Sequence, residues 1–107
     1  MDIKQLIFDT LKPLGIKTSY QTYSGADDKY IMFGMDEDDG GYEDDEATEI
    51  RYNIQLNYWC TRPQDVDLYR QIKKQLKSVG FVFDGASDRF DDNYYGKQME
   101  YIYTEYL

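Results

Sequence analysis

The sequence predicts an α+β domain: a mostly antiparallel sheet with two helices packed on one face and a long acidic loop. Three observations lead to this prediction. Apolar residues recur at helical spacing in two segments, they alternate strictly with polar residues in a third, and acidic residues gather in a single run. The chain has 107 residues, which suits one domain, so residues 1–107 are expected to fold as one unit.

The first expected element is a helix over residues 2–14. Asp2 can cap its start, and Pro13 followed by Gly15 ends it. Residues 16–23 lean toward β structure, and the apolar run at residues 29–35 predicts a strand. The apolar positions of the helix are separated by three or four residues and form one stripe: Ile3, Leu6, Ile7, Leu11 and Leu14.

The clearest signal is a long strand over residues 49–60. Twelve residues alternate without a break between an apolar and a polar face, from Glu49 and Ile50 to Trp59 and Cys60. At about 3.3 Å per residue the strand would measure about 40 Å, whereas a compact chain of this size is only about 33 Å across. A straight strand would therefore reach the edge of its own domain, and protruding hairpins commonly need a partner.

The second half of the chain adds a helix and two strands. Pro63 suits a helix start and Gly80 a helix end, and residues 64–79 carry an apolar stripe between them. A strand opens at Phe81, turns are expected at residues 84–87 and 91–93, and the last strand covers 97–106. The basic residues of the helix follow helical spacing, which indicates a solvated face that could pair with a neighbour's acids: Arg70, Lys73, Lys74 and Lys77.

The net charge of −9 comes from one stretch of 14 residues between Asp36 and Glu49. The stretch contains no base, and outside it 12 acidic residues balance 12 basic ones. Because like charges this close repel, we expect an exposed, mobile loop. A chain with this charge should not wrap nucleic acid directly. The nine acids of the loop are Asp36, Glu37, Asp38, Asp39, Glu43, Asp44, Asp45, Glu46 and Glu49.

The acidic run does not fit a specific calcium loop. An EF-hand that starts at Asp36 needs Asp or Asn at its fifth position and Glu at its twelfth, where this chain has Gly40 and Ala47. Loose association with Mg²⁺ or Ca²⁺ and a merely solvated loop both remain open.

Enzymatic chemistry is not expected, and neither is a cofactor or a metal centre. The chain has no His and a single Cys, Cys60, which removes the usual zinc sites, an internal disulfide and His-dependent nucleophilic catalysis. There is no glycine-rich phosphate loop, and no apolar run approaches the length of a membrane helix. The first residues lack the pattern of a signal peptide, so a cytoplasmic setting is expected.

Tyrosine is abundant, with 12 residues, and suits protein interfaces because a large apolar ring carries a polar tip. The alternative is that most of these rings build the core of the sheet. Trp59 falls on the polar face of the long strand, either packed under the second helix or exposed for a partner. The candidate subunit interface comprises Tyr58, Trp59, Tyr94, Tyr95, Tyr101 and Tyr103.

Several segments, in this order, resemble the tail terminator (tail completion) proteins of long-tailed bacteriophages and prophages, often labelled minor capsid or head–tail joining proteins. The likeness covers nearly the whole chain as a pattern of elements and scattered residues. One difference is Lys97, at a place where relatives can carry a His. The segments that carry the likeness are residues 29–33, 44–46, 52–59, 79–81 and 99–103.

The resemblance implies a structural protein of the virion that assembles in the cytoplasm of the bacterial host. Copies of the chain would close into a ring, expected to be hexameric, on the last ring of the tail tube. The ring would stop tube growth and dock to the head–tail connector protein, and DNA would pass through without specific binding. The family has no catalytic motif, so the resemblance implies no catalytic residue.

Two other functions stay open. The chain could be a different neck component, such as a head-completion or stopper protein. It could also be an acidic inhibitor that mimics DNA, although such a protein should spread carboxylates over a rigid surface and not confine them to one loop.

Overall fold

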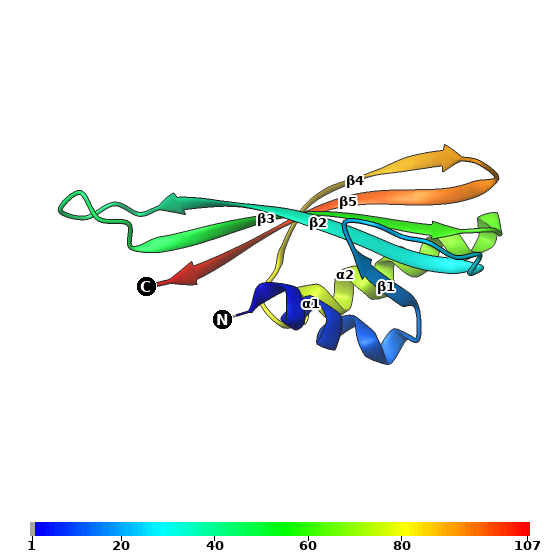
Figure 1. The fold of residues 1–107 in the computed structure, drawn as a ribbon, viewed down its shortest axis with the longest axis horizontal. Coiled ribbons are helices and arrows are strands. Elements are labelled where there is room, and N and C mark those ends of the chain that lie inside the picture. The colour runs from blue at the N-terminus through cyan, green and yellow to red at the C-terminus, as the bar shows by residue number, and fades with distance from the viewer. Residues whose placement is uncertain (1) are drawn as a thin grey trace.

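The computed structural model describes residues 2–107, so Met1 of the predicted domain lies outside the described residues. Two helices cover one face of a five-stranded sheet (Figure 1), which confirms the predicted α+β class. Two 3₁₀ segments, Lys12–Leu14 and Pro63–Leu68, adjoin the helices. The elements are α1 (Ile3–Leu11), β1 (Lys17–Tyr20), β2 (Lys29–Gly40), β3 (Glu49–Cys60), α2 (Tyr69–Ser78), β4 (Val82–Asp91) and β5 (Tyr94–Tyr106).

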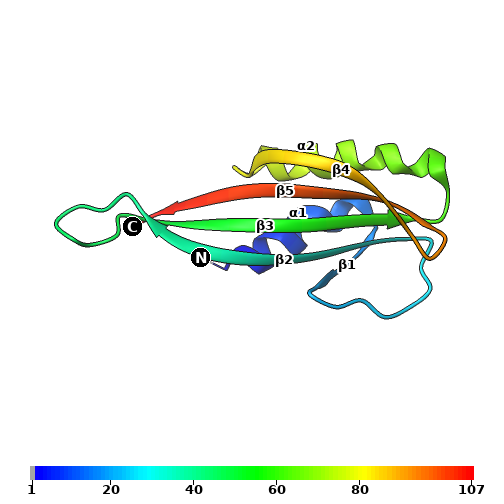
Figure 2. The ribbon, with the colours of Figure 1, turned by 90° about the horizontal axis from the view of Figure 1, so that it is seen from above.

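The strands lie in the order β1-β2-β3-β5-β4, with β1 and β4 at the two edges. Only β1 and β2 run parallel, and the other three pairs are antiparallel. Seen from above in Figure 2, α1 and α2 lie on the same side of the sheet. The opposite side, called the outer face here, carries no helix.

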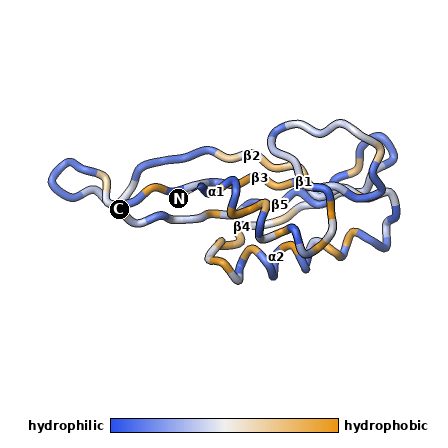
Figure 3. The backbone as a smooth tube through the Cα atoms, turned by 60° about the horizontal axis from the view of Figure 1, so that its bottom comes forward, coloured by the Kyte–Doolittle hydropathy of each residue, from blue (hydrophilic) through white to orange (hydrophobic). Residues whose placement is uncertain are grey.

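The core lies between the sheet and the helices. Each helix contributes a short apolar stripe: Ile7 and Leu11 from α1, and Ile72 and Leu76 from α2, all fully buried. Figure 3 shows hydrophobic stretches in the helices and in the strands, and a run of hydrophilic residues along the acidic end of β2 and the turn after it. The buried residues of the sheet are Ile31, Phe33, Tyr52, Ile54, Leu56, Tyr58, Cys60, Met99 and Tyr101. Phe81, just before β4, is buried with them.

The long strand is confirmed over the predicted residues. From Tyr52 to Cys60, every second side chain of β3 is buried and the residues between them are half-buried. The molecule measures 52 × 24 × 24 Å, so it is elongated along its strands. The expected protrusion is therefore present, and β3 lies at the centre of the sheet between β2 and β5.

The residues expected at the two ends of the first helix take the predicted roles, whereas the start of the second helix differs from its prediction. The Asp2 side chain accepts a hydrogen bond from the Gln5 backbone N–H at 3.0 Å, which caps α1 as predicted. The chain leaves the helix through Lys12–Leu14, and Gly15 takes a left-handed φ of 69°. The second helix differs from its prediction, because residues Pro63–Leu68 form a 3₁₀ segment and the α-helix begins only at Tyr69.

The turn expected at residues 84–87 is wrong. These residues stay in β4, and the register with β5 shifts between Phe83 and Ala86, where Gly85 has a φ of 126°. Turn-forming residues here mark a β-bulge that bends an edge strand. The turn at 91–93 is confirmed, because Asp92 and Asn93 have positive φ and join the two strands tightly.

Candidate functional site

The acidic segment is an ordered hairpin end and not a loop throughout, so that part of the prediction is wrong. Strand β2 continues through the acids to Gly40, and β3 starts at Glu49, which leaves only residues 41–48 as the connection. The register pairs Asp36 with Asn53 and Asp38 with Arg51. We call residues 36–49 the arm, and it projects beyond the helices (Figure 1).

The strand tolerates these acids because a pleated strand separates them. Glu37 and Asp39 lie on the helix side, while Asp36 and Asp38 lie on the outer face, so neighbouring carboxylates point away from one another. Across the ladder they meet neutral or basic residues of β3. Asn53 Nδ2 donates to Asp38 Oδ2 at 3.0 Å. Like-charge repulsion along the sequence is therefore weaker than the linear run suggests.

Arg51 is the one basic residue placed at the arm's base. Its Nε lies 3.4 Å from Glu49 Oε1, and its guanidinium lies against the backbone of Gly40, where any Cβ would collide with it. The guanidinium is the far end of a flexible, half-exposed side chain, so a larger residue at Gly40 would displace Arg51 from this position.

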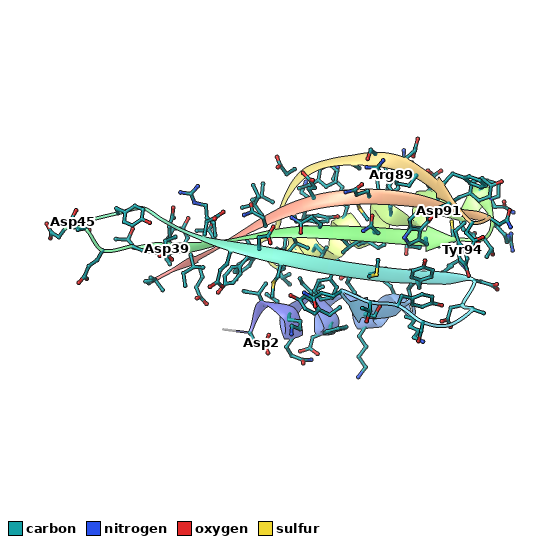
Figure 4. All side chains as sticks on the ribbon, turned by 45° about the horizontal axis from the view of Figure 1, so that its top comes forward. Asp2, Asp39, Asp45, Arg89, Asp91 and Tyr94 are labelled. Carbon is teal, nitrogen blue, oxygen red and sulfur yellow. The ribbon has the colours of Figure 1, made fainter. Side chains whose placement is uncertain are left out.

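The tip of the arm is a tight turn. The backbones of Glu43 and Glu46 exchange two hydrogen bonds of 2.9 Å, and Asp44 and Asp45 between them both have positive φ. The Thr48 hydroxyl donates to the Gly41 carbonyl at the base of the turn. All four acids of the tip are exposed, and Figure 4 shows Asp45 at the far end of the molecule. The predicted exposure of these carboxylates is confirmed.

Large apolar side chains are exposed beside these carboxylates. Tyr42 in the tip is 67% exposed, and Tyr106 and Leu107 at the end of β5 are 79% and 71% exposed. The Leu107 N–H donates to the Thr48 carbonyl at 2.9 Å, so the C-terminus is tied to the arm. The arm therefore offers both negative charge and apolar surface.

The opposite charge gathers on α2. Lys73 is half-buried, with its Nζ 4.0 Å from the centre of the Phe83 ring, and Arg70, Lys74 and Lys77 are exposed. The helix Tyr69–Ser78 contains no acid. Within residues 2–107, none of these four cations has an ion pair. The predicted solvated basic face is confirmed for Arg70, Lys74 and Lys77, whereas Lys73 lies partly against the core.

The six aromatic residues proposed as an interface separate into three groups. Tyr58 and Tyr101 lie in the core under the helices, so neither belongs to a surface of this chain. The Tyr58 hydroxyl donates to the Asp65 carbonyl at 2.8 Å, and burial raises the pKa of both phenols. Tyrosine suits both an interface and the core of a sheet, and the structure places these two rings in the core.

Tyr95 and Tyr103 are half-buried on the helix side. The Tyr95 ring packs edge-on against Phe90 at 5.1 Å, and the Tyr103 ring packs against Phe81 at 4.8 Å. These two rings extend the core toward its rims. Phe90 remains 64% exposed next to Tyr95.

Trp59 and Tyr94 lie on the outer face, so Trp59 does not pack under the second helix. The indole of Trp59 covers Gly96 of β5, its register partner, where an added Cβ would lie 2.6 Å from Cε3. Trp59 is half-buried. Of the two alternatives, the structure supports a ring open to solvent on its far side.

Two further tyrosines complete an aromatic corner that the sequence did not reveal. The rings of Tyr23 and Tyr30 stack at 3.6 Å with an angle of 2°, and Tyr94 meets Tyr30 edge-on at 5.5 Å. These rings and Trp59 line a shallow hollow of about 240 Å³ together with Asp91. The register pairing of Tyr30 with Trp59 creates the corner, and only the pairing of β2 with β3 could have indicated it.

Asp27 holds this corner together. Tyr23 Oη donates to Asp27 Oδ2 at 2.6 Å, Lys17 Nζ lies 3.6 Å from the same oxygen, and Tyr94 Oη donates to the Asp27 carbonyl at 3.0 Å. The Tyr23 hydrogen bond, helped by Lys17, lowers the pKa of Asp27, and partial burial raises the pKa of Tyr23. The corner is a structural tie between the β1–β2 connection and β5.

Two other kinds of chemical group remain: the thiol of Cys60 and side chains that could bind a metal ion. Cys60 is buried, and burial raises the pKa of its thiol. Across residues 2–107, no three His, Cys, Asp or Glu side chains are placed to hold a metal ion. Within the same residues, no helix has the length and hydropathy needed to cross a bilayer.

Comparison with known proteins shows a fold that this chain shares with a solved structure, and it shows no family. No protein-family model and no curated protein sequence matches the chain. A solved structure that carries only a locus designation superposes with a TM-score of 0.63 at 9% sequence identity. The match covers 98% of this chain and 93% of the other. At this identity the similarity shows a shared fold over nearly the whole length of both chains.

Proposed function

We propose that this chain is a tail terminator subunit of a long-tailed bacteriophage or prophage. Copies close into a ring, hexameric by the resemblance, on the last ring of the tail tube. The ring ends tube growth and joins the tail to the head–tail connector protein at the neck of the virion. The observation that supports this most is the elongated shape, 52 Å by 24 Å, with a charged arm that extends beyond the packed body.

The physical argument concerns the kind of contact that a ring needs. In a ring, one patch of each copy binds a different patch on the next copy. A projecting arm and a separate basic helix face are two such patches on one chain. The function is one of assembly, so the proposal needs no catalytic residue and no cofactor.

The arm carboxylates suit two roles within such a ring. Facing the lumen or its rim, they would repel passing DNA so that it does not adhere. Before assembly, the arms of different free subunits would repel one another. This repulsion would delay assembly until cations or a basic partner neutralise the carboxylates. Neutralising five of them tests both roles: Asp36, Asp38, Asp39, Asp44 and Asp45, each replaced by Asn. If the variant assembles at the same salt and magnesium concentrations as the wild type, and DNA ejection is unchanged, both roles are wrong.

The function itself is tested on isolated tail tubes. The purified protein is added to tube subunits during polymerisation, and tube length and tube ends are examined by negative-stain microscopy. We expect shorter tubes that carry extra density at one end. Tubes that grow to their usual length with bare ends would contradict the proposal. Density that appears on isolated connectors and never on tubes would indicate a different neck component instead.

One observation favours a second candidate, an acidic protein that mimics DNA. A DNA mimic needs carboxylates on a rigid surface, and the sequence had predicted a flexible loop. In the structure, four carboxylates, Asp36 to Asp39, lie on an ordered strand. On each face of that strand the carboxylates repeat about every 6.7 Å. Competition for duplex DNA by a panel of DNA-binding proteins and nucleases tests this function. Inhibition that disappears in the five-site Asn variant would support it.

A further inference from the structure

We propose that the arm of one copy docks on the α2 face of a second copy of this chain. The acceptor is the exposed stripe of Arg70, Lys74 and Lys77 with the adjoining Val79. The inference rests on the proposed ring and identifies the contact that closes it.

Charge is the first argument. The arm carries nine acids and no base, while α2 carries four bases and no acid. Arg70, Lys74 and Lys77 follow i, i+4, i+7 spacing, so they share one helix face about 10 Å long. Neither the tip acids nor these three cations have an ion pair within residues 2–107. Both surfaces are therefore free to meet an opposite charge.

Apolar surface is the second argument. Among residues 2–107, six large apolar side chains are exposed, and four of them lie on or beside the two proposed surfaces. Tyr42 lies in the arm, Tyr106 and Leu107 end β5 beside it, and Val79 follows the last turn of α2. Docking would cover apolar groups on both sides of the contact, which charge attraction alone would not achieve.

The arm cannot dock on its own α2. At the base of the arm, Glu49 of β3 pairs with Gly40 of β2 on one side and with Tyr106 of β5 on the other. This three-stranded pairing prevents the arm from folding back onto the helix. Tyr103 packs on Phe81 just after α2, and its register partner Tyr52 is seven residues from the tip at Asp45. Three residues of strand separate Tyr52 from Glu49, so the connection at the tip begins about 10 Å beyond the end of the helix, more than one Debye length at physiological salt. The partner has to be another molecule.

The test is a charge swap. The arm variant carries Asp39→Lys, Glu43→Lys and Glu46→Lys, none of which has a positive φ. The helix variant carries Arg70→Glu, Lys74→Glu and Lys77→Glu. A control variant makes the same charge change away from the arm, on exposed acids: Asp9→Lys, Asp28→Lys and Asp84→Lys. Circular dichroism checks that each variant folds, and sedimentation velocity with native mass spectrometry gives the size of the assemblies.

We expect each swapped variant alone to associate at least tenfold more weakly than the wild type, and the control to associate normally. An equimolar mixture of the two variants should recover assembly, because every arm then meets an α2 of opposite charge. In a ring this restores every contact only when the number of copies is even. Wild-type association should also weaken as salt rises, which is the opposite of what repulsion between arms alone would give.

Three results would overturn the inference: a wild-type chain that stays monomeric at about 1 mM in low salt, single variants that associate like the wild type, or a mixture that recovers nothing. Adding the same variants to tail tubes distinguishes this failure from that of the proposed function. If the arm variant still caps tubes as the wild type does, the arm contact is wrong and the function stands. If the wild type does not cap tubes but the mixture recovers assembly, the function is wrong and the contact stands.

Discussion

Replacing Gly96 by Ala should disturb one identifiable contact, the indole of Trp59 lying over the backbone of β5. A Cβ at Gly96 would lie 2.6 Å from Cε3 and 2.7 Å from Cζ3 of Trp59, well inside normal contact distance. The backbones of β3 and β5 are fixed by the ladder, so the ring has to move. Because Trp59 borders solvent on the outer face, it can swing outward without disrupting the core.

The cost follows from three contributions. Leaving a preferred rotamer costs about 0.5–1.5 kcal/mol. A buried tryptophan covers about 150–250 Å², and losing roughly 50 Å² of that contact costs about 1.2 kcal/mol. Alanine has fewer conformations than glycine in the unfolded chain, which stabilises the folded state by about 0.4–1 kcal/mol. The net expectation is a loss of about 1–2 kcal/mol in the free energy of unfolding.

This loss is measured by urea unfolding, with far-UV circular dichroism and tryptophan emission as the two signals. Trp59 is the only tryptophan in the chain, so the emission reports on this one contact. With a urea m-value of about 1.5 kcal/mol/M, the midpoint should fall by roughly 1 M. The native emission should also shift to the red as the ring becomes more exposed.

The matched control is Gly34→Ala, in the neighbouring strand β2 on the same outer face. An added Cβ at Gly34 has no atom within 4 Å, so this variant should be neutral or slightly more stable. If Gly96→Ala is as stable as Gly34→Ala and its emission is unchanged, then the contact between Trp59 and Gly96 has no energetic role.

Three further predictions concern the core and the aromatic corner. Leu56→Ala should lower the free energy of unfolding by about 2–5 kcal/mol, because Leu56 is fully buried between sheet and helices; a loss below 1 kcal/mol in a urea titration would contradict this core. Cys60 should resist alkylation by iodoacetamide at pH 8 in the native protein and react fully in urea, because burial both shields its thiol and raises the thiol pKa; equal rates by mass spectrometry would show that the site is open. The pKa of Asp27 is lowered in the folded protein, so its carboxylate stabilises the fold above the ordinary value of 3.8 and this contribution disappears as the pH falls through the lower folded pKa. The stability of Asp27→Asn, measured by urea unfolding between pH 6 and 2, should therefore vary less with pH than that of the wild type, and parallel curves would contradict the hydrogen bond from Tyr23.

The sequence by itself determined the elements whose cause is local. Period-two alternation predicted β3 over its full length, because a strand with one buried face must repeat every second residue. The spacing of apolar residues predicted α1, and Asp2 and Gly15 marked its ends because a helix leaves backbone groups unpaired there. The confinement of the excess charge between Asp36 and Glu49 was also evident from the sequence.

Only the tertiary structure decided which segments meet. The acids from Asp36 to Asp39 became strand because β3 pairs with them, and no local pattern in an acidic run reveals a partner 15 residues away. Likewise the sequence left open whether Trp59 packs under the second helix, and the structure places its ring over Gly96 on the outer face because both helices cover the other face. Asp84 and Gly85 form a bulge and not a turn, because β4 resumes its pairing with β5 at Ala86. Contacts between segments distant in sequence decide these features, whereas local preferences contribute only fractions of the free energy involved.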